Sequence, residues 1–476
     1  MTPEDFDDAV LQEADEAAEQ PRESESLDKE NRLKPDFVRR VQDALEAGET
    51  DAVYDMVEPL HPADIADLFE LIEEDERLPL ARAINDQMGV EVFAELNDHV
   101  RELLLEEIPA GIIADIAEQL DTDDAVAMIE DLDEEDQKAV LAEMEPEDRA
   151  AIETALAYPE ETAGRLMSRD FVAVPEHMTV GDLIDFLRDD KRLATEFWEV
   201  FIVDARHHPV GTCLLSWILR SPRSVPLSDV MKRDQTLIPV AMDQEEVALR
   251  FQKYALISAA VVDDDGRLVG QITVDDVVHI IQEEASEDIL RLSGAGDGDI
   301  NEPIRLTVKT RLTWLVVNLG TAIVASSVVG LFQGAIAHFA LLAVLMPIVS
   351  GMGGNAGTQT LAVVVRALAT NQLTDSNTLR MIGRELRIAM ANGMSLGVLI
   401  GVGTALLFGN PLLGLVIGSA MVINNLVAGL AGILVPVTLD RANVDPAVSS
   451  AVFVTMATDV MGFFSFLGLA VLSGLA

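Results

Sequence analysis

The stretch MPIVSGMGGNAGTQT, from Met346 to Thr360, places four glycines and two carboxamides inside a long uncharged run. An uncharged run longer than about 20 residues is typical of a membrane span. Glycines remove side chains, allow a helix to distort and expose backbone carbonyls, and irregular backbone at membrane depth is tolerated where it lines water. The stretch therefore predicts a span that lines a water-filled path.

The charge of the chain is divided between two regions. From Lys309 onward there are seven Lys or Arg and five Asp or Glu, so 26 of the 33 basic and 77 of the 82 acidic residues precede Lys309. The front region, with a net charge of −51, is predicted to be soluble, and the back region to lie in lipid. So acidic a surface repels nucleic acid and attracts cations. We expect no nucleic-acid partner; adaptation to a salty cytoplasm and specific cation sensing both stay open.

Two further features concern the compartment. Cys213 is the single cysteine, which excludes an intramolecular disulfide and fits a reducing environment. The first residues, MTPEDFDDAV, are acidic and lack an apolar core. We therefore expect no cleaved signal peptide.

The soluble region divides into a tail and two domains. Residues 1–33 are rich in Glu, Asp and Ser, which predicts a disordered acidic tail. Residues 34–157 carry apolar side chains at helical spacing, broken by Pro, and predict a stack of short helices. LDTDD (Leu120 to Asp124) and LDEED (Leu132 to Asp136) are predicted helix N-caps within it.

Residues 158–283 contain an internal repeat. The segments from Leu166 and from Val230 are parallel in sequence, as are VFIVDARHHPVGTCLLSWIL from Val200 and AAVVDDDGRLVGQITVDDVV from Ala259. Each copy predicts a β-α-β-β-α unit, and the pair resembles a tandem CBS domain. That resemblance implies ATP or another adenosine nucleotide as a ligand in the cleft between the copies. Residues 284–308 are predicted to form a charged connecting helix, either a solvated linker or a lever to the membrane.

Residues 309–476 predict five transmembrane helices, at roughly 312–332, 335–365, 388–408, 412–439 and 447–473. Lys and Arg gather before the first span, between the second and third, and between the fourth and fifth. The distribution of positive charge places the N-terminal region in the cytoplasm and the C-terminus outside, in a plasma (inner) membrane.

Asp459 is the candidate ion-binding residue. It lies near the middle of the fifth span, where a carboxylate costs at least about 2.5 kcal/mol unless it is compensated. No Lys or Arg lies within any span. Asp459 must therefore be protonated, hydrated or facing a mobile cation, and a protonated Asp bonding across helices is the structural alternative. If two chains meet there, a divalent cation could bridge the two carboxylates.

Other residues of the second, fourth and fifth spans could line the same path or serve only to pack helices. The candidates are Gly353, Gly354, Asn355, Gly357, Gln359, Asn424, Thr455, Thr458 and Gly462. Ala451, Thr455, Thr458, Gly462 and Ser465 form a stripe of small residues that permits close helix packing. Neutral oxygens with one carboxylate per chain suit Mg²⁺, which keeps most of its water.

Three motifs carry a resemblance to a family. P-x-x-x-G-x-G-G-N-x-G-x-Q at Pro347 to Gln359, RALAT at Arg366 to Thr370, and T-D-x-x-G at Thr458 to Gly462 look like the MgtE family of magnesium channels. The resemblance implies a multidomain α/β plus all-α membrane protein. It also implies a homodimer with its pore on the two-fold axis and Asp459 as the pore carboxylate.

The resemblance further implies gating by intracellular Mg²⁺ at acidic positions of the soluble region. The matching residues are Glu91, Asp123, Asp243, Glu245, Asp276, Glu284, Glu287 and Asp288. His279, Ala127 and Ala255 depart from the acidic pattern, so some regulatory ions are expected to be lost or moved.

Two other functions stay open: a proton- or sodium-coupled secondary transporter, and a membrane sensor that conducts no ions. The sequence holds no Walker-type phosphate loop and no hydrolase or transferase constellation. We therefore expect that the protein is not an enzyme.

Overall fold

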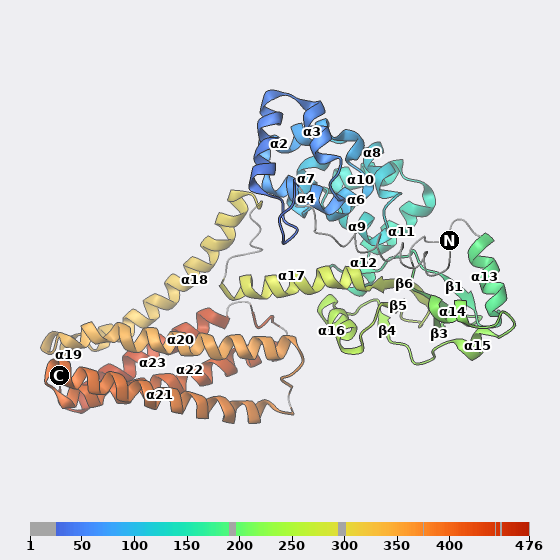
Figure 1. Ribbon diagram of the computed structural model, residues 1–476. Helices are drawn as coiled ribbons and strands as arrows, with labels where there is room; N and C mark the ends of the chain where they lie inside the picture. Colours follow the sequence, from blue (N-terminus) through green and yellow to red (C-terminus); the bar gives the residue numbers. More distant parts are fainter. Residues whose placement is uncertain are drawn as a thin grey trace, which may run out of the picture. The chain divides into compact units, whose positions relative to one another are not determined.

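The computed structural model of the protein describes residues 25–189, 197–293, 301–374, 376–442, 444–447 and 450–475. The chain forms two compact units, Met1–Val277 and Val278–Ala476 (Figure 1). Most of the predicted acidic tail lies outside the described residues. Its last residues, from Glu25, form a turn closed by a bridge between Leu27 and Leu33.

The first unit begins with short helices, as the sequence predicts. They are α2 (Pro35–Ala47), α3 (Thr50–Val57), α4 (Pro62–Leu71), α5 (Glu74–Ala83), the 3₁₀ turn η1 (Asn85–Gln87), α6 (Val90–Glu95), α7 (Asp98–Leu105), α8 (Ala110–Ala117), α9 (Thr122–Glu130), α10 (Glu134–Glu143) and α11 (Pro146–Leu156). Asp121 and Asp133 are the N-caps of α9 and α10, and Asp133 accepts backbone hydrogen bonds from Glu135 and Asp136. A continuous apolar core, with Phe69 and Phe93 fully buried, holds the helices together.

The internal repeat folds into two equivalent halves. The first contains α12 (Ala163–Leu166), β1 (Ala173–Pro175), α13 (Val180–Asp189), β2 (Glu199–Val203), β3 (Pro209–Leu214) and α14 (Leu215–Arg220). The second contains α15 (Leu227–Val230), β4 (Leu237–Pro239), α16 (Gln244–Tyr254), β5 (Ser258–Val262), β6 (Leu268–Thr273) and α17 (Val274–Ser293). Each sheet has a parallel pair followed by an antiparallel pair, in the orders β1-β2-β3 and β4-β5-β6.

Each half also contributes its leading segment to the other half. Ser168, before the first sheet, bridges Gln271 of β6, and Lys232, before the second, bridges Thr212 of β3. This reciprocal exchange gives the internal two-fold arrangement of a tandem CBS domain, in agreement with the sequence analysis.

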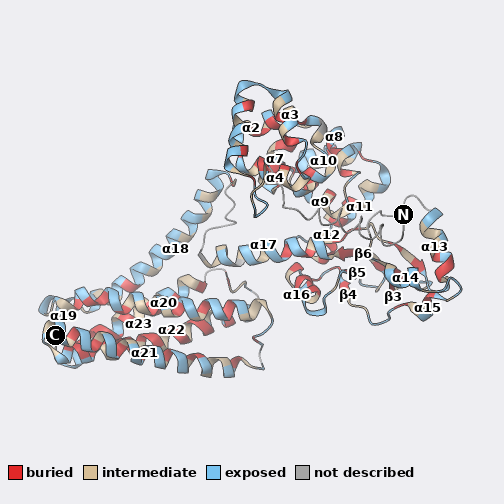
Figure 2. Ribbon diagram, viewed as in Figure 1, coloured by how far each residue is buried: buried red, intermediate tan, exposed pale blue. Residues whose placement is uncertain are grey.

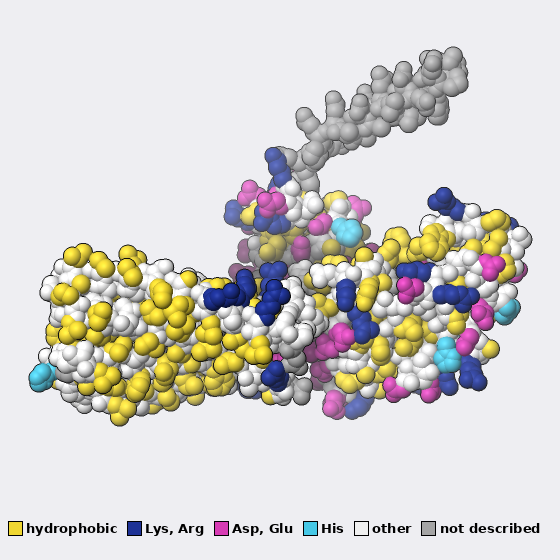
Figure 3. Space-filling model, turned by 90° about the horizontal axis from the view of Figure 1, so that it is seen from below, with side chains coloured by type: hydrophobic (Ala, Val, Ile, Leu, Met, Phe, Trp, Pro, Cys, Tyr) yellow, Lys and Arg dark blue, Asp and Glu magenta, His cyan; other side chains and the backbone are white. Residues whose placement is uncertain are grey.

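Among its described residues, the second unit contains five helices long and apolar enough to cross a membrane. They are α18 (Ile304–Leu331), α20 (Leu341–Ala369), α21 (Thr378–Phe408), α22 (Pro411–Arg441) and α23 (Ser450–Leu472), and the short helix α19 (Gln333–His338) joins the first two. Figure 3 shows a largely hydrophobic surface on this unit, with Lys and Arg gathered at one end. The helices are longer than several of the predicted spans because the arginine-bearing ends of α20 and α21 continue as helix beyond the apolar core.

Helix α22 is the central helix of this unit, and α18 is the peripheral one. Helix α22 packs against α20, α21 and α23, and most of its most apolar stretch is buried, whereas α18 packs chiefly against α23 and is almost entirely exposed (Figure 2). An apolar helix with so little cover needs lipid or another chain around it.

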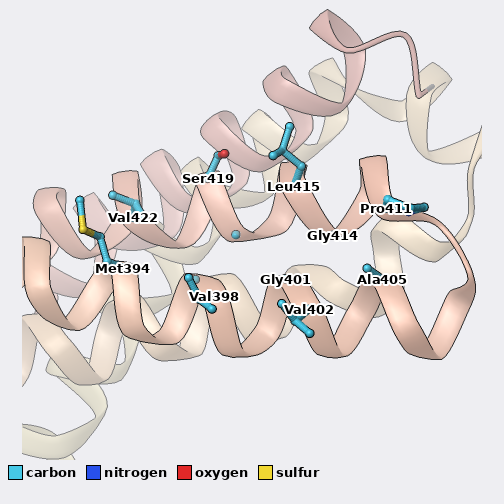
Figure 4. A pocket seen from close by; sticks show the side chains of 12 residues that line it. Met394, Val398, Gly401, Val402, Ala405, Pro411, Gly414, Leu415, Ser419 and Val422 are labelled. Atoms are coloured by element: carbon cyan, nitrogen blue, oxygen red, sulfur yellow. The ribbon is translucent and has the colours of Figure 1, made fainter.

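Glycines bring the backbones of α21 and α22 into contact. A Cβ atom at Gly397 would lie 2.7 Å from the carbonyl oxygen of Gly418, and one at Gly418 would lie 2.8 Å from that of Gly397. Gly401 and Gly414 repeat the arrangement one turn along (Figure 4). The two helices leave an apolar groove of about 470 Å³ along this seam. Small residues four apart are typical of close helix packing in membranes.

One expectation about the opening glycine stretch is wrong. Helix α20 is α-helical from Leu341 to Ala369, through Pro347 and all four glycines, so it presents no distorted backbone at this depth. Gly353 and Gly357 are instead buried against neighbouring helices. The missing side chains serve helix packing, which keeps the backbone carbonyls in helical hydrogen bonds.

Candidate ion pathway

Asp459 lies in α23 and is partly buried where α23 packs against α20. Its Oδ1 accepts a short hydrogen bond from the hydroxyl of Ser350 in α20. The ion pairs among the described residues do not include Asp459. A hydroxyl offers a single proton, so one neutral donor compensates this carboxylate within the described chain.

Asn424 of α22 fills the space beside this pair. Its side chain is fully buried, and its Nδ2 donates a 2.8 Å hydrogen bond to the carbonyl of Val349. Gly353 of α20 and Gly462 of α23 leave the room that the carboxamide occupies, since a Cβ at Gly462 would lie 2.8 Å from Nδ2. The Oδ1 atom of Asn424 is enclosed and has no hydrogen-bond partner among the described residues. Asn424 therefore joins three helices at the level of Asp459.

The structure divides the predicted pore-lining residues into two groups. Gly353, Gly357, Asn424, Thr458 and Gly462 are buried between helices of the same chain. Asn355, Gln359 and Thr455 are exposed at the surface of the single chain, and Gly354 is half-buried. The small-residue stripe on α23 accordingly packs through Thr458 and Gly462 against α20 and α22. The second group makes the outer faces of α20 and α23 polar.

Ser350 and the glycine seam of α21 and α22 are features that our sequence analysis missed. Ser350 immediately precedes the glycine motif and could have been suspected as a polar residue in an apolar run. Gly393, Gly397 and Gly401 recur at intervals of four, which is a readable packing signal.

In the first unit, the predicted regulatory residues Asp123 and Asp276 lie close to a third carboxylate, Asp124. Burial, the charge of Asp276 and the charge of Asp124 raise the pKa of Asp123 well above its usual value. Burial, then Asp276 and Asp121, raise the pKa of Asp124 to about 6. One carboxylate oxygen of Asp123 is enclosed without a hydrogen-bond partner among the described residues, and Asp276 accepts hydrogen bonds from Thr273. The negative charges of these three carboxylates therefore repel one another at this point of the first unit.

Within the first unit, the predicted regulatory residues Glu91 and Asp243 do not form a metal-binding group with these carboxylates among the described residues. Glu91 is exposed on α6, and Asp243 caps α16, where it accepts a hydrogen bond from the backbone of Glu245. Glu284 and Glu287 lie on α17 within the second unit, and the side chain of Asp288 lies outside the described residues. Among the residues that the structure describes, no three His, Cys, Asp or Glu are arranged to hold a metal ion.

The fold and the site together define a multi-pass membrane protein with an acidic soluble region and a carboxylate inside its helix bundle. Family models agree: MgtE, described as a divalent cation transporter, matches residues 346–469, the MgtE intracellular N domain matches 60–161, and the CBS domain matches 227–283. The chain belongs to the MgtE family.

Curated relatives cover almost the whole chain. The magnesium transporter MgtE of Enterococcus faecalis is 33% identical over 86% of this chain and 86% of its own length. That of Thermus thermophilus is 31% identical over 90% of this chain and 97% of its own length. Among solved structures, the cytosolic domain of the Mg²⁺ channel MgtE in complex with ATP is 28% identical, with a TM-score of 0.47, over 51% of this chain and 99% of that one.

Proposed function

We propose that this protein is a Mg²⁺-selective channel, gated by intracellular Mg²⁺, that admits magnesium through a path containing Asp459. The observation that carries the proposal is the pairing of Asp459 with one serine hydroxyl at membrane depth, without a Lys or Arg partner among the described residues. A carboxylate in that position is costly unless it faces water or a cation. The relatives named as magnesium transporters support this cargo.

The path lies between two copies of the chain. Asn355, Gln359 and Thr455 are exposed in the single chain, although polar groups at membrane depth avoid lipid. A second copy related by a two-fold axis would cover these faces of α20 and α23 and bring two Asp459 carboxylates toward one ion. The homodimer thereby supplies two carboxylates with neutral oxygens from Ser350, Asn355 and Thr455, a set suited to a hydrated Mg²⁺.

Entry of Mg²⁺ needs no coupled energy source. Arg366 of α20 and Arg380, Arg384 and Arg387 of α21 lie at the adjoining ends of these helices, which favours a cytoplasmic position for that side and for the N-terminal unit. A dication that enters a cell at −100 mV gains about 4.6 kcal/mol, twice the value for one charge. A gate is then sufficient for control.

The gate responds to carboxylates in the soluble region. Low Mg²⁺ leaves Asp123, Asp124 and Asp276 repelling one another, and bound Mg²⁺ would relieve that repulsion and favour the closed arrangement. Helix α17 carries this state toward the membrane helices, because Arg291 near its end bonds Asp445 before α23 and Leu292 packs against residues of α20 and α23. An adenosine nucleotide at the CBS pair stays a prediction.

Flux measurements distinguish this function from the alternatives. Purified protein in liposomes with an inside-negative potential should admit Mg²⁺, read by an internal dye, without any pH or Na⁺ gradient. A flux that requires such a gradient would indicate a coupled transporter. No flux at low internal Mg²⁺ would indicate a sensor.

A further inference from the structure

A second polar cavity lies within each chain, and Asp459 does not line it. It has a volume of about 210 Å³, lies between α20, α21 and α22, and is open to the surface on one side. Its polar lining comes from Gln359 and Thr360 of α20, Arg384, Glu385 and Asn392 of α21, and Asn425 of α22. The pathway described above uses only Gln359 of these residues.

Glu385 is a buried carboxylate with little compensation. Its exposed fraction is 6%, and no hydrogen bond to its side chain is formed by the described residues. Its ion-pair partner among them is Arg384, whose Nη1 lies 3.5 Å from Oε1 and whose side chain is 61% exposed. A solvated guanidinium at that distance compensates a buried charge only weakly. The carboxylate is therefore available to another cation.

Asn425 supplies a second acceptor without a partner. Its side chain is 1% exposed, and its Nδ2 donates a 2.9 Å hydrogen bond to the carbonyl of Met421. Its Oδ1 is enclosed and unbonded among the described residues. Buried acceptors without a partner are uncommon, and each asks for a donor or a cation. Gln359 and Asn392 add two further carboxamide side chains to the lining.

The volume fits a cation that keeps much of its water. At about 30 Å³ per water molecule, the cavity holds about seven waters, enough for one hydrated ion. Mg²⁺ keeps several waters and is commonly bound through one or two carboxylates. We infer that this cavity holds a partly hydrated divalent cation, the transported Mg²⁺, between Glu385 and the carboxamide oxygens of Asn425, Gln359 and Asn392.

This inference rests on the proposed function for the role of the site. Gln359 is nine residues from Ser350 on α20, so the two differ by about 13 Å along the helix axis. Glu385 lies beside Arg380, Arg384 and Arg387, at the end of the bundle assigned above to the cytoplasm. Because Gln359 also belongs to the face of α20 that the path uses, the cavity is then a second station beside the path between the two copies. Conduction benefits from several sites that each bind weakly enough to release the ion.

The test uses Mn²⁺ as the probe, since its anomalous scattering locates it in crystals of the full-length protein. We expect a peak in the cavity and another at Asp459 in the wild type. Glu385→Gln should remove the first peak and keep the second. Glu302→Gln is the matched control, because Glu302 is equally buried in the same unit but accepts a 2.8 Å hydrogen bond from Thr307. It should keep both peaks.

A gain of binding gives an independent check. Asn425→Asp adds a carboxylate where Oδ1 is unbonded, and we expect the cavity peak to half-saturate at a Mn²⁺ concentration at least tenfold lower. An empty cavity at Mn²⁺ concentrations that fill the Asp459 site would overturn the inference, as would a peak unchanged in Glu385→Gln. A separate result tests the proposed function. If the wild-type protein shows no Mg²⁺ flux but its cavity holds Mn²⁺, the channel function is contradicted and the cation site is supported.

Discussion

Arg291, near the end of α17, donates a 2.7 Å hydrogen bond from Nη1 to Oδ2 of Asp445, in the segment between α22 and α23. Oδ1 of the same carboxylate accepts a 2.7 Å hydrogen bond from the backbone of Ala447, just before α23. Leu292 adds an apolar contact with the cluster formed by Leu361, Val365, Ala447 and Val454. The connecting helix is thus fastened to the helix that carries Asp459.

This link predicts a loss of coupling when its charge is reversed. Arg291→Glu should weaken Mg²⁺-dependent closure while leaving the open-state flux of Mg²⁺ intact, because the end of α17 is released but the path is unchanged. The measurement is flux into liposomes as a function of internal Mg²⁺.

A compensating change supplies the control for that variant. Arg291→Glu combined with Asp445→Arg should restore closure, and the interaction energy should be about 0.5–1 kcal/mol for a half-exposed pair. Equal closure in all three proteins would contradict a coupling role for this contact.

The fit of Asn424 between glycines predicts a sharp contrast between neighbouring positions. Gly353→Ala places a methyl group against the carboxamide of Asn424 and should destabilise the membrane unit by about 1–3 kcal/mol. Gly354→Ala, one residue along the same helix, meets no atom within 4 Å in the described chain. Thermal unfolding in detergent should separate the two variants, and equal melting temperatures would show that Asn424 moves freely.

The buried carboxylates of the first unit predict a dependence of stability on pH. A carboxyl group whose pKa is raised in the folded state binds its proton more tightly there, so it adds stability below about pH 4 that is lost as pH rises through about 6. Asp124→Asn should reduce this pH-dependent loss in the free energy of unfolding by about 1–2 kcal/mol, after allowance for solvent screening.

Urea unfolding of the full chain, followed by the fluorescence of Trp198 and Trp217 with Trp314 replaced by Phe, measures that stability between pH 5 and 7.5. Asp136→Asn is the matched control, because Asp136 is exposed on α10. We also expect added Mg²⁺ at pH 7.5 to replace the stabilising protons. The account of this cluster is wrong if the pH profile of Asp124→Asn coincides with that of the wild type.

A protein that lacks residues 1–157 is expected to conduct Mg²⁺ but to close less in response to internal Mg²⁺. The deletion takes away Asp123 and Asp124 but leaves the membrane unit and the CBS pair. Mg²⁺ flux should persist and its closure by internal Mg²⁺ should weaken. Unchanged closure would exclude the N-terminal helices from the sensor.

Much of this fold could be predicted from local patterns. The repeated segments predicted two equal β-α-β-β-α units, and the charge division predicted a soluble region before five spans. These features depend on periodicity and composition, which a single sequence displays directly. Asp459 could be identified as a candidate ion-binding residue for the same reason, since a carboxylate in an apolar span has few structural explanations.

The residues that depend on tertiary packing could not be predicted in this way. The glycines at 353 and 357 are compatible in sequence with either a distorted helix or a closely packed one. In the structure the side chain of Asn424 lies against Gly353, so this glycine serves helix packing. Glu385 could not be identified from the sequence, because an acidic residue among arginines is typical of the polar end of a membrane span. Its importance comes from burial against α22, which only the folded chain reveals.

Mg²⁺ entry into proteoliposomes shows whether Asp459 belongs to the ion path. Wild type, Asp459→Ala and the control Asp440→Asn, at the exposed end of α22, should be compared at equal folded amounts under an inside-negative potential. We expect Mg²⁺ flux in the wild type and in Asp440→Asn, with a loss of at least tenfold in Asp459→Ala. Equal flux in all three would contradict this expectation and make Asp459 a structural residue.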